Sequence, residues 1–250
     1  MRKTKAPHVT TLPKRETERI GAPVEVRRHP AARRLTLRVS RTRRAVIVTL
    51  PIQCGIEEAG SFLHRNLDWV RERLDSLPEP IPFQDGIIVP LRGVAHRVVM
   101  PGEIPRRRVV RRIDAHPFPL LDAPGQAADA VKRLEQWLTK EARCDLEQRV
   151  AWHADRLGVK PGRLSIRDQT SRWGSCSTTG ALSFSWRLVL APPAVLDYVA
   201  AHEVAHLREM NHGPRFWSLV RQSCPAMEDA KRWLRVYGMD LHRYGVQTGA

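Results

Sequence analysis

Residues 202–212 read His-Glu-Val-Ala-His-Leu-Arg-Glu-Met-Asn-His, an H-E-x-x-H pattern followed by a third histidine. On a helix, His202 and His206 lie one turn apart on the same face, so both imidazoles can reach one metal ion. Glu203 stands beside the first of them, where its carboxylate can take a proton from a water held by the metal. His212 would supply a third protein ligand and leave a fourth position open, as in a catalytic zinc site.

The position of His212 adds a condition on the fold. In a straight helix it would lie about 9 Å further along the axis than His206, at about 1.5 Å per residue. Nitrogen ligands at about 2.0–2.1 Å from a shared ion exclude that separation. We therefore expect the helix to end near Met210 and Asn211 and the chain to turn back, because residues 211–214 (Asn-His-Gly-Pro) are of types that terminate helices.

The segment before this pattern favours a metal site over three solvated histidines. Residues 195–201 are mostly apolar, with Val195, Tyr198 and Val199 at helical spacing. On a largely buried helix, unpaired histidines and a glutamate would be costly, and a bound ion accounts for all of them. Imidazole ligation also accepts Mn²⁺, Ni²⁺ or Co²⁺, so we predict one Zn²⁺ per chain with these ions as alternatives.

Further motifs accompany the histidine pattern. They are Arg172-Trp173-Gly174-Ser175-Cys176-Ser177, Ser185-Trp186-Arg187-Leu188, Ala191-Pro192-Pro193, Asn211-His212 and Phe216-Trp217. With them, over most of residues 24–240, the chain resembles the YgjP-like family of predicted zinc-dependent hydrolases, which have a minimal zincin metallopeptidase domain related to the WLM and SprT-like proteases.

This resemblance implies that His202, His206 and His212 are the metal ligands and that Glu203 is the catalytic base. The ligand spacing equals that of metzincins, but Glu209 stands where those enzymes have glycine, and no convincing Met-turn follows. A metzincin assignment is therefore not supported.

Charge is concentrated near the N-terminus. The net charge is +16, and residues 1–50 contain 14 Lys and Arg against 3 acidic residues. The arginine clusters at 27–28, 33–34 and 41–44 fit either contact with the phosphates of a nucleotide or nucleic acid, or a solvated arginine-rich surface. No aromatic residue lies among these arginines, so a base-stacking platform is not indicated.

Other features bear on location. No apolar run approaches the roughly 18 residues that a membrane span needs, and residues 1–20 lack the apolar stretch of a secretory signal. The four cysteines are far apart without C-x-x-C spacing, which favours a reducing compartment. We expect a cytoplasmic protein with no membrane contact. Cys176, in the tryptophan loop, fits a small packed residue better than a fourth ligand, because three histidines already suffice.

The pattern of apolar residues predicts an α+β fold in three parts. Residues 1–23 are expected to be a disordered basic tail, and residues 24–125 a small, mainly β part with one helix at 56–77. Residues 126–250 are expected to form the zincin-like catalytic domain. Its predicted elements are a long helix ended by Gly158, short strands at 163–168 and 181–187, the motif helix, and helices at 214–223 and 226–238.

The expected chemistry is hydrolysis of a peptide or protein. Arg172 and Arg187, with Tyr198, are the candidates for stabilising the developing oxyanion. Trp173 and Trp186 fit either the wall of a cleft or the core. If residues 181–187 form an edge strand beside the metal, an extended peptide can pair along it.

Two alternatives stay open at this point. One is a metal-dependent nucleoside triphosphate pyrophosphohydrolase that binds phosphate through the N-terminal arginines. The other is a nucleic-acid-associated metalloprotease, in which the basic region docks on the nucleic acid.

Overall fold

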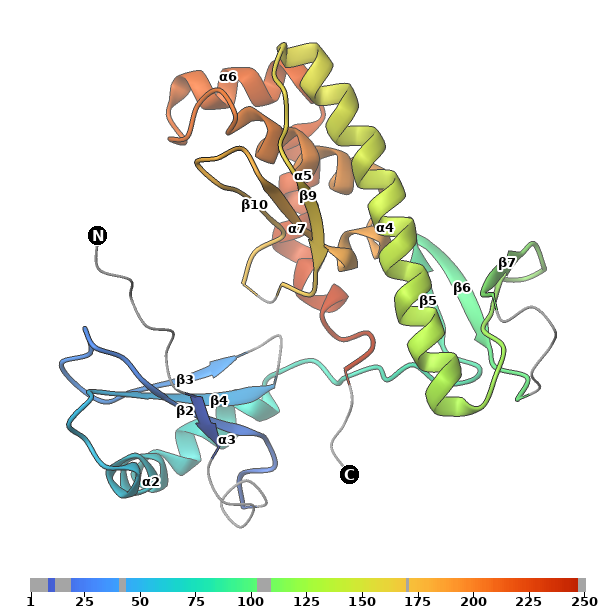
Figure 1. Cartoon of the computed structure of the whole chain (residues 1–250). Coiled ribbons are helices and arrows are strands. Elements are labelled where there is room, and N and C mark those ends of the chain that lie inside the picture. The colour runs from blue at the N-terminus through green and yellow to red at the C-terminus, as the bar shows by residue number, and fades with distance from the viewer. Residues whose placement is uncertain (1–8, 12–18, 41–43, 103–108, 170, 247–250) are drawn as a thin grey trace. The chain divides into compact units, whose positions relative to one another are not determined.

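The computed structural model of the chain describes residues 9–11, 19–40, 44–102, 109–169 and 171–246 (Figure 1). The chain divides into two compact units, residues 1–79 and residues 80–250. Both units combine helices with small sheets, so the predicted α+β class is confirmed.

The first unit is a four-stranded sheet with two helices. Its strands are β1 (Val9–Thr11), β2 (Val24–Arg28), β3 (Thr36–Ser40) and β4 (Ala45–Leu50), in the order β1-β2-β4-β3. The β2–β4 pair is parallel and the other pairs are antiparallel. One face of the sheet forms a core with the helices, because Val24, Val46 and Val48 cluster with Leu63 and Leu74.

Two helices replace the single helix predicted at 56–77. They are α2 (Ile56–Arg65) and α3 (Leu67–Asp75), with Asn66 between them. The Asn66 side-chain amide donates to the Phe62 carbonyl at 2.8 Å, so it binds a carbonyl at the end of α2 and interrupts the helix.

The predicted tail, residues 1–23, lies partly outside the described residues. Its described portions belong to the first unit. Strand β1 pairs with β2, and Ile20 and Ala22 are buried in the core of the unit.

The second unit begins with another four-stranded sheet. Its strands are β5 (Ile88–Leu91), β6 (Val94–Val99), β7 (Arg111–Ile113) and β8 (Leu120–Asp122), in the order β5-β6-β8-β7. Buried residues of this sheet, such as Val89, Val98 and Leu121, share one core cluster with the helix that follows. The boundary between the two compact units lies between Glu79 and Pro80 in the chain, whereas the boundary predicted from the sequence is at 125/126.

The remainder of the second unit carries the histidine motif. Its elements are α4 (Ala127–Leu157), β9 (Leu164–Arg167), β10 (Gly174–Cys176), β11 (Leu182–Ser185), the 3₁₀ helix η1 (Trp186–Leu190), α5 (Pro193–Ala205), α6 (Pro214–Ser223) and α7 (Met227–Leu241). As predicted, Gly158 ends α4 in the left-handed conformation, with φ 60°. The long helix α4 packs against α5, α6 and η1.

The small sheet does not meet the condition set for peptide pairing along residues 181–187. Strand β11 lies in the centre, parallel to β9 and antiparallel to β10, so these residues do not form an edge strand. Strand β10 is an edge instead. Trp186 and Arg187 do not continue β11 but begin η1, because the Ser185 hydroxyl caps it by accepting from the Arg187 backbone N–H.

Candidate metal centre

Helix α5 positions the first two histidines. It begins with Pro193 in its first turn, which suits the fixed φ of proline. Helix α5 packs against α4, α6, α7 and β10, and most of its own side chains are apolar and buried in these contacts. His202 and Glu203 lie in its last turn, and Glu203 is only 5% exposed.

The helix ends earlier than the sequence suggests. Its last helical residue is Ala205, and His206 forms the C-terminal cap. A tight turn follows, in which the Leu207 N–H donates to the Val204 carbonyl and the Arg208 N–H to that of Ala205. The chain then reverses direction toward α6, as the third ligand requires.

The reversal needs no left-handed residue at Asn211. Among the described non-glycine residues, only Arg44 and Arg92 have positive φ, at 45° and 51°. The expected bend is therefore present, and the chain makes it without a left-handed residue at Asn211.

The three histidines converge on one point. His202, His206 and His212 each offer a ring nitrogen, and these atoms lie within 4.8 Å of one another. The Nε2 atoms of His202 and His212 are 3.1 Å apart. Two ligands at about 2.0–2.1 Å in a tetrahedral shell would be separated by about 3.3 Å, so the spacing fits a shared ion.

The second ring nitrogen of His206 also fits a metal site, whereas that of His202 has no such partner in the described part of the chain. The Nδ1 of His206 lies 3.1 Å from the Glu209 carbonyl, and donation to that carbonyl leaves Nε2 free as a ligand. The Nδ1 of His202 is buried and lacks a hydrogen-bond partner among the described residues. Burial lowers the pKa of His202 to about 4, with further contributions from His206 and His212, which favours the neutral ring that binds metals.

Two aromatic residues of α6 form the wall behind the histidines. Phe216 is fully buried, with ring centroids 4.9, 4.5 and 4.7 Å from those of His202, His206 and His212. Trp217 lies 5.8 Å from both His202 and His212. An apolar wall of this kind restricts water around a metal and holds the rings in place.

The carboxylate of Glu203 lies against the edge strand β10. Burial raises the pKa of Glu203 to about 7, and the positive charge of Arg172 opposes that rise. A Cβ placed on Gly174 would lie 2.6 Å from both Cγ and Oε1 of Glu203. The strand therefore approaches the carboxylate so closely that any residue larger than glycine would displace the Glu203 side chain, a role that the sequence motif alone does not indicate.

The two predicted catalytic arginines lie in different surroundings. Arg172 is exposed, and its charge acts on Glu203. Arg187 is buried, and its guanidinium donates to the Asp168 carboxylate at 2.8 and 3.1 Å. It also donates to the carbonyls of Leu241 and Tyr244. These contacts favour a structural role for Arg187, which ties the C-terminal segment to the small sheet.

Among the other predicted candidates, Tyr198 contacts a histidine of the motif, whereas the described ring contacts of Trp173 and Trp186 are with other residues. Tyr198 is 5.9 Å from His202, edge to face, and burial raises its pKa to about 12. Trp173 stacks on His242 at 4.8 Å, whereas Trp186 is 7% exposed and belongs to the core.

Cys176 is the remaining residue of the tryptophan loop that could have been a ligand. Burial raises the pKa of its thiol, and the nearby Glu203 raises it further. The raised pKa disfavours the thiolate that binds metals. Among the described residues, the metal-ligating cluster consists of the three histidines without it.

Three imidazoles that converge beside a buried carboxylate, next to the edge of a small sheet, define the class of single-metal hydrolases. The family model described as YgjP-like, metallopeptidase domain, matches residues 33–237. The chain thus belongs to the YgjP-like family and carries a metallopeptidase domain, as the resemblance implied.

Two solved structures are similar to part of the chain. One is the metallopeptidase zymogen abylysin of Pyrococcus abyssi, with 23% identity and a TM-score of 0.33, covering 37% of this chain and 92% of that one. The other is the metallopeptidase zymogen jannalysin of Methanocaldococcus jannaschii, with 20% identity and a TM-score of 0.31, covering 36% and 96%. None of the curated proteins compared matches the chain. Within the described residues, no helix has the length and apolar character to cross a membrane.

Proposed function

We propose that this metallopeptidase hydrolyses peptide bonds with Zn²⁺ held by His202, His206 and His212 and with Glu203 as general base. The observation that carries the proposal is the convergence of the three ring nitrogens within 4.8 Å beside the buried Glu203 carboxylate. A bound Zn²⁺ supplies Lewis-acid activation of water and of the carbonyl to be cleaved.

Glu203 performs the proton transfers in this proposal. Its carboxylate takes a proton from the attacking water and passes it to the amine that leaves. Its burial supports this role, since desolvation raises its pKa and makes it a stronger base than an exposed glutamate. Arg172 is the candidate for stabilising the oxyanion, because it is exposed beside Glu203, whereas the guanidinium of Arg187 is already paired.

Strand β10 supports a peptide as the substrate. In the described sheet it has one neighbour, β11, so its outer edge is unpaired. An extended peptide can add to such an edge through backbone hydrogen bonds. Because Gly174 on this strand is adjacent to Glu203, a peptide in that position would pass close to the base.

The test compares substrate classes on one preparation of protein. Metal content is measured by elemental analysis, and the zinc-loaded protein is incubated with a library of unstructured peptides and, separately, with nucleoside triphosphates. We expect new peptide termini by mass spectrometry and no release of pyrophosphate. Release of pyrophosphate while the peptides stay intact would contradict the peptidase proposal and support the nucleoside triphosphate pyrophosphohydrolase instead.

A second test addresses the basic N-terminal region. Arg28 and Arg44 bind backbone carbonyls of the first unit, whereas Arg33 and Arg34 are exposed. Deleting residues 1–23 would remove the buried Ile20, so substitution of the exposed arginines is the cleaner experiment.

Under the peptidase proposal, the Arg33→Gln, Arg34→Gln double variant cleaves peptides at the wild-type rate. If the two arginines neutralise DNA phosphates, the slope of DNA affinity against salt, on logarithmic axes, falls by about 0.9 for each arginine that does so. Slower peptide cleavage would instead point to a role of this surface in substrate binding.

The close approach at Gly174 makes a further prediction. In the Gly174→Ala variant, the new methyl group displaces the Glu203 side chain, and we expect kcat to fall by about 10²-fold, the cost of a misplacement near 1 Å. Zinc content should stay unchanged, because the three atoms nearest to this methyl group belong to Glu203 and not to a histidine. Gly213→Ala is the matched control, since a Cβ there meets nothing within 4 Å. Equal activity of both variants would show that Glu203 tolerates displacement.

A further inference from the structure

A buried polar network joins three helices behind the metal centre. His153 of α4 is 0% exposed, and its Nε2 lies 2.8 Å from the Asp197 carboxylate of α5. Its Nδ1 lies 2.5 Å from the hydroxyl of Ser223, which is 1% exposed at the end of α6. Arg149 of α4 pairs with the same Asp197 oxygen. Because the carboxylate accepts, the proton of His153 lies on Nε2, and both ring nitrogens have a partner.

The same three residue types form nucleophilic triads in other proteins, but this network cannot act as one. The Ser223 hydroxyl and the His153 ring are closed to solvent, so a substrate cannot reach them. In a triad the serine contacts Nε2 and the carboxylate Nδ1, whereas here the two partners are exchanged. A hydrogen-bond network around a buried histidine with both ring nitrogens paired instead fixes the geometry of the elements that it joins.

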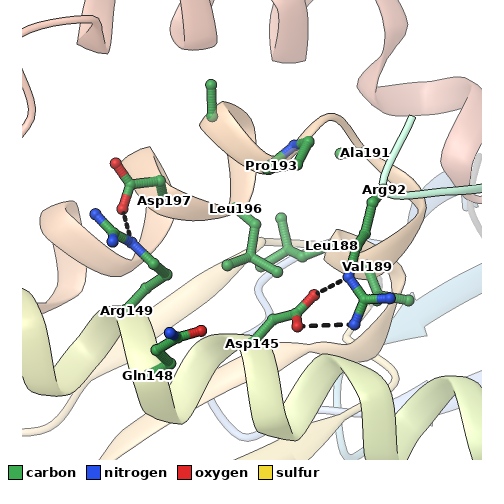
Figure 2. Close-up of a pocket in the computed structure, with 11 residues that line it drawn as sticks. Arg92, Asp145, Gln148, Arg149, Leu188, Val189, Ala191, Pro193, Leu196 and Asp197 are labelled. Atoms are coloured by element: carbon green, nitrogen blue, oxygen red, sulfur yellow. Dashed lines mark hydrogen bonds and ion pairs between the residues drawn. The ribbon is translucent and has the colours of Figure 1, made fainter. Parts of the chain in front are cut away.

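A cavity shows why polar contacts matter at this position. Between α4 and the first half of α5 lies a cavity of about 350 Å³, with the Arg149–Asp197 pair at one side and the Arg92–Asp145 pair at the other (Figure 2). Side chains do not fill this space, so apolar packing alone does not set the spacing of the two helices here. Of the two ion pairs, Arg149–Asp197 joins α4 to α5, whereas Arg92–Asp145 joins the turn between β5 and β6 to α4.

Helix α6 connects the network to the third histidine. It begins at Pro214, two residues after His212, and ends at Ser223. In between it carries Phe216, which contacts all three imidazole rings. A shift of α6 relative to α5 therefore moves His212 and Phe216 together with respect to His202. Ligand geometry tolerates only about 0.5 Å of such movement.

We propose that His153, held between Asp197 and Ser223, is a positioning residue that fixes α6 against α5 and thereby places His212 within reach of the metal. The proposal rests on the proposed metal site. It assigns His153 no contact with substrate or metal.

The test removes the network and reads out the metal. In the His153→Leu and Ser223→Ala variants, we expect zinc affinity, measured by competition with a chromophoric chelator, to weaken by about tenfold or more. The visible spectrum of the Co²⁺-substituted protein should change, because His212 no longer completes the same ligand geometry. kcat should fall by about tenfold or more while KM changes by less than about twofold. His153→Gln, which can both donate and accept, should recover part of each loss.

Arg156→Gln is the matched control. Arg156 also joins α4 to the end of α6, through its Nε and the Gln222 carbonyl at 3.1 Å, but at the exposed surface. This variant should keep the wild-type zinc affinity and cobalt spectrum. If His153→Leu fails to fold, Ser223→Ala, which removes one hydroxyl, decides the question.

The outcomes separate the two proposals. Variants that melt at lower temperature but keep the zinc affinity and cobalt spectrum of the wild type would overturn the positioning role. A wild-type protein that binds zinc but cleaves no peptide would overturn the proposed function, while metal affinity would still decide the role of His153.

Discussion

Replacing Glu203 with glutamine is expected to abolish peptide hydrolysis while the protein keeps one metal ion per chain. The amide has nearly the shape of the carboxylate but cannot accept a proton, and loss of a general base costs about 10²–10⁴-fold in rate. The histidines remain, so elemental analysis should find unchanged zinc. Folding should not suffer, since the carboxylate is 5% exposed and burial of its charge is unfavourable.

Glu209→Gln is the control for this variant. Glu209 lies on the turn between the second and third histidines, and it is its backbone carbonyl, not its side chain, that faces the His206 ring. The control should therefore retain activity. Hydrolysis that survives in Glu203→Gln but is lost in Glu209→Gln would mean that the base has been assigned to the wrong carboxylate.

The second large effect concerns His212. The His212→Ala variant keeps two of the three proposed ligands, His202 on α5 and His206 at its C-terminal cap. We expect its zinc affinity to fall by more than about 100-fold, which exceeds the loss caused by removing a residue that only hydrogen-bonds to a ligand. The consequence for stability follows by linkage. Zinc at 100 times the wild-type Kd stabilises the wild-type fold by about 2.7 kcal/mol, but a 100-fold weaker site gains only about 0.4 kcal/mol at that concentration.

Thermal unfolding with and without zinc measures this difference directly. The melting temperature of the wild type should rise on addition of zinc, and that of His212→Ala should barely change. His64→Ala, an exposed histidine of the first unit, should behave as the wild type. A full zinc-induced shift in His212→Ala would show that the third ligand is another group.

The convergence of the three histidines is the most predictable feature of the candidate site. The spacing of His202, His206 and His212 restricts the geometry so strongly that one helix and one reversal satisfy it. The residue at which the chain turns back was harder to predict, because the turn after Ala205 depends on short-range backbone hydrogen bonds that several sequences support equally well. The stripe of apolar residues and Gly158 were sufficient to predict α4 and its end.

Features that depend on distant partners were not predictable. Alternating residues in 181–187 look the same in a central strand and in an edge strand, and the neighbour β9 decides which it is. In the same way, Arg187 is defined by Asp168 and by carbonyls more than fifty residues away. The domain boundary predicted at 125/126 separates the sheet of β5 to β8 from α4, although these elements share one core.

Gly174 also limits how this enzyme can diversify. A methyl group at that position would displace the Glu203 side chain, so we expect mutation there to impair activity and not to change the substrate preference. If peptides bind along β10 as proposed, changes in the choice of substrate have to arise from other positions along β10, or from segments that face it across the cleaved bond.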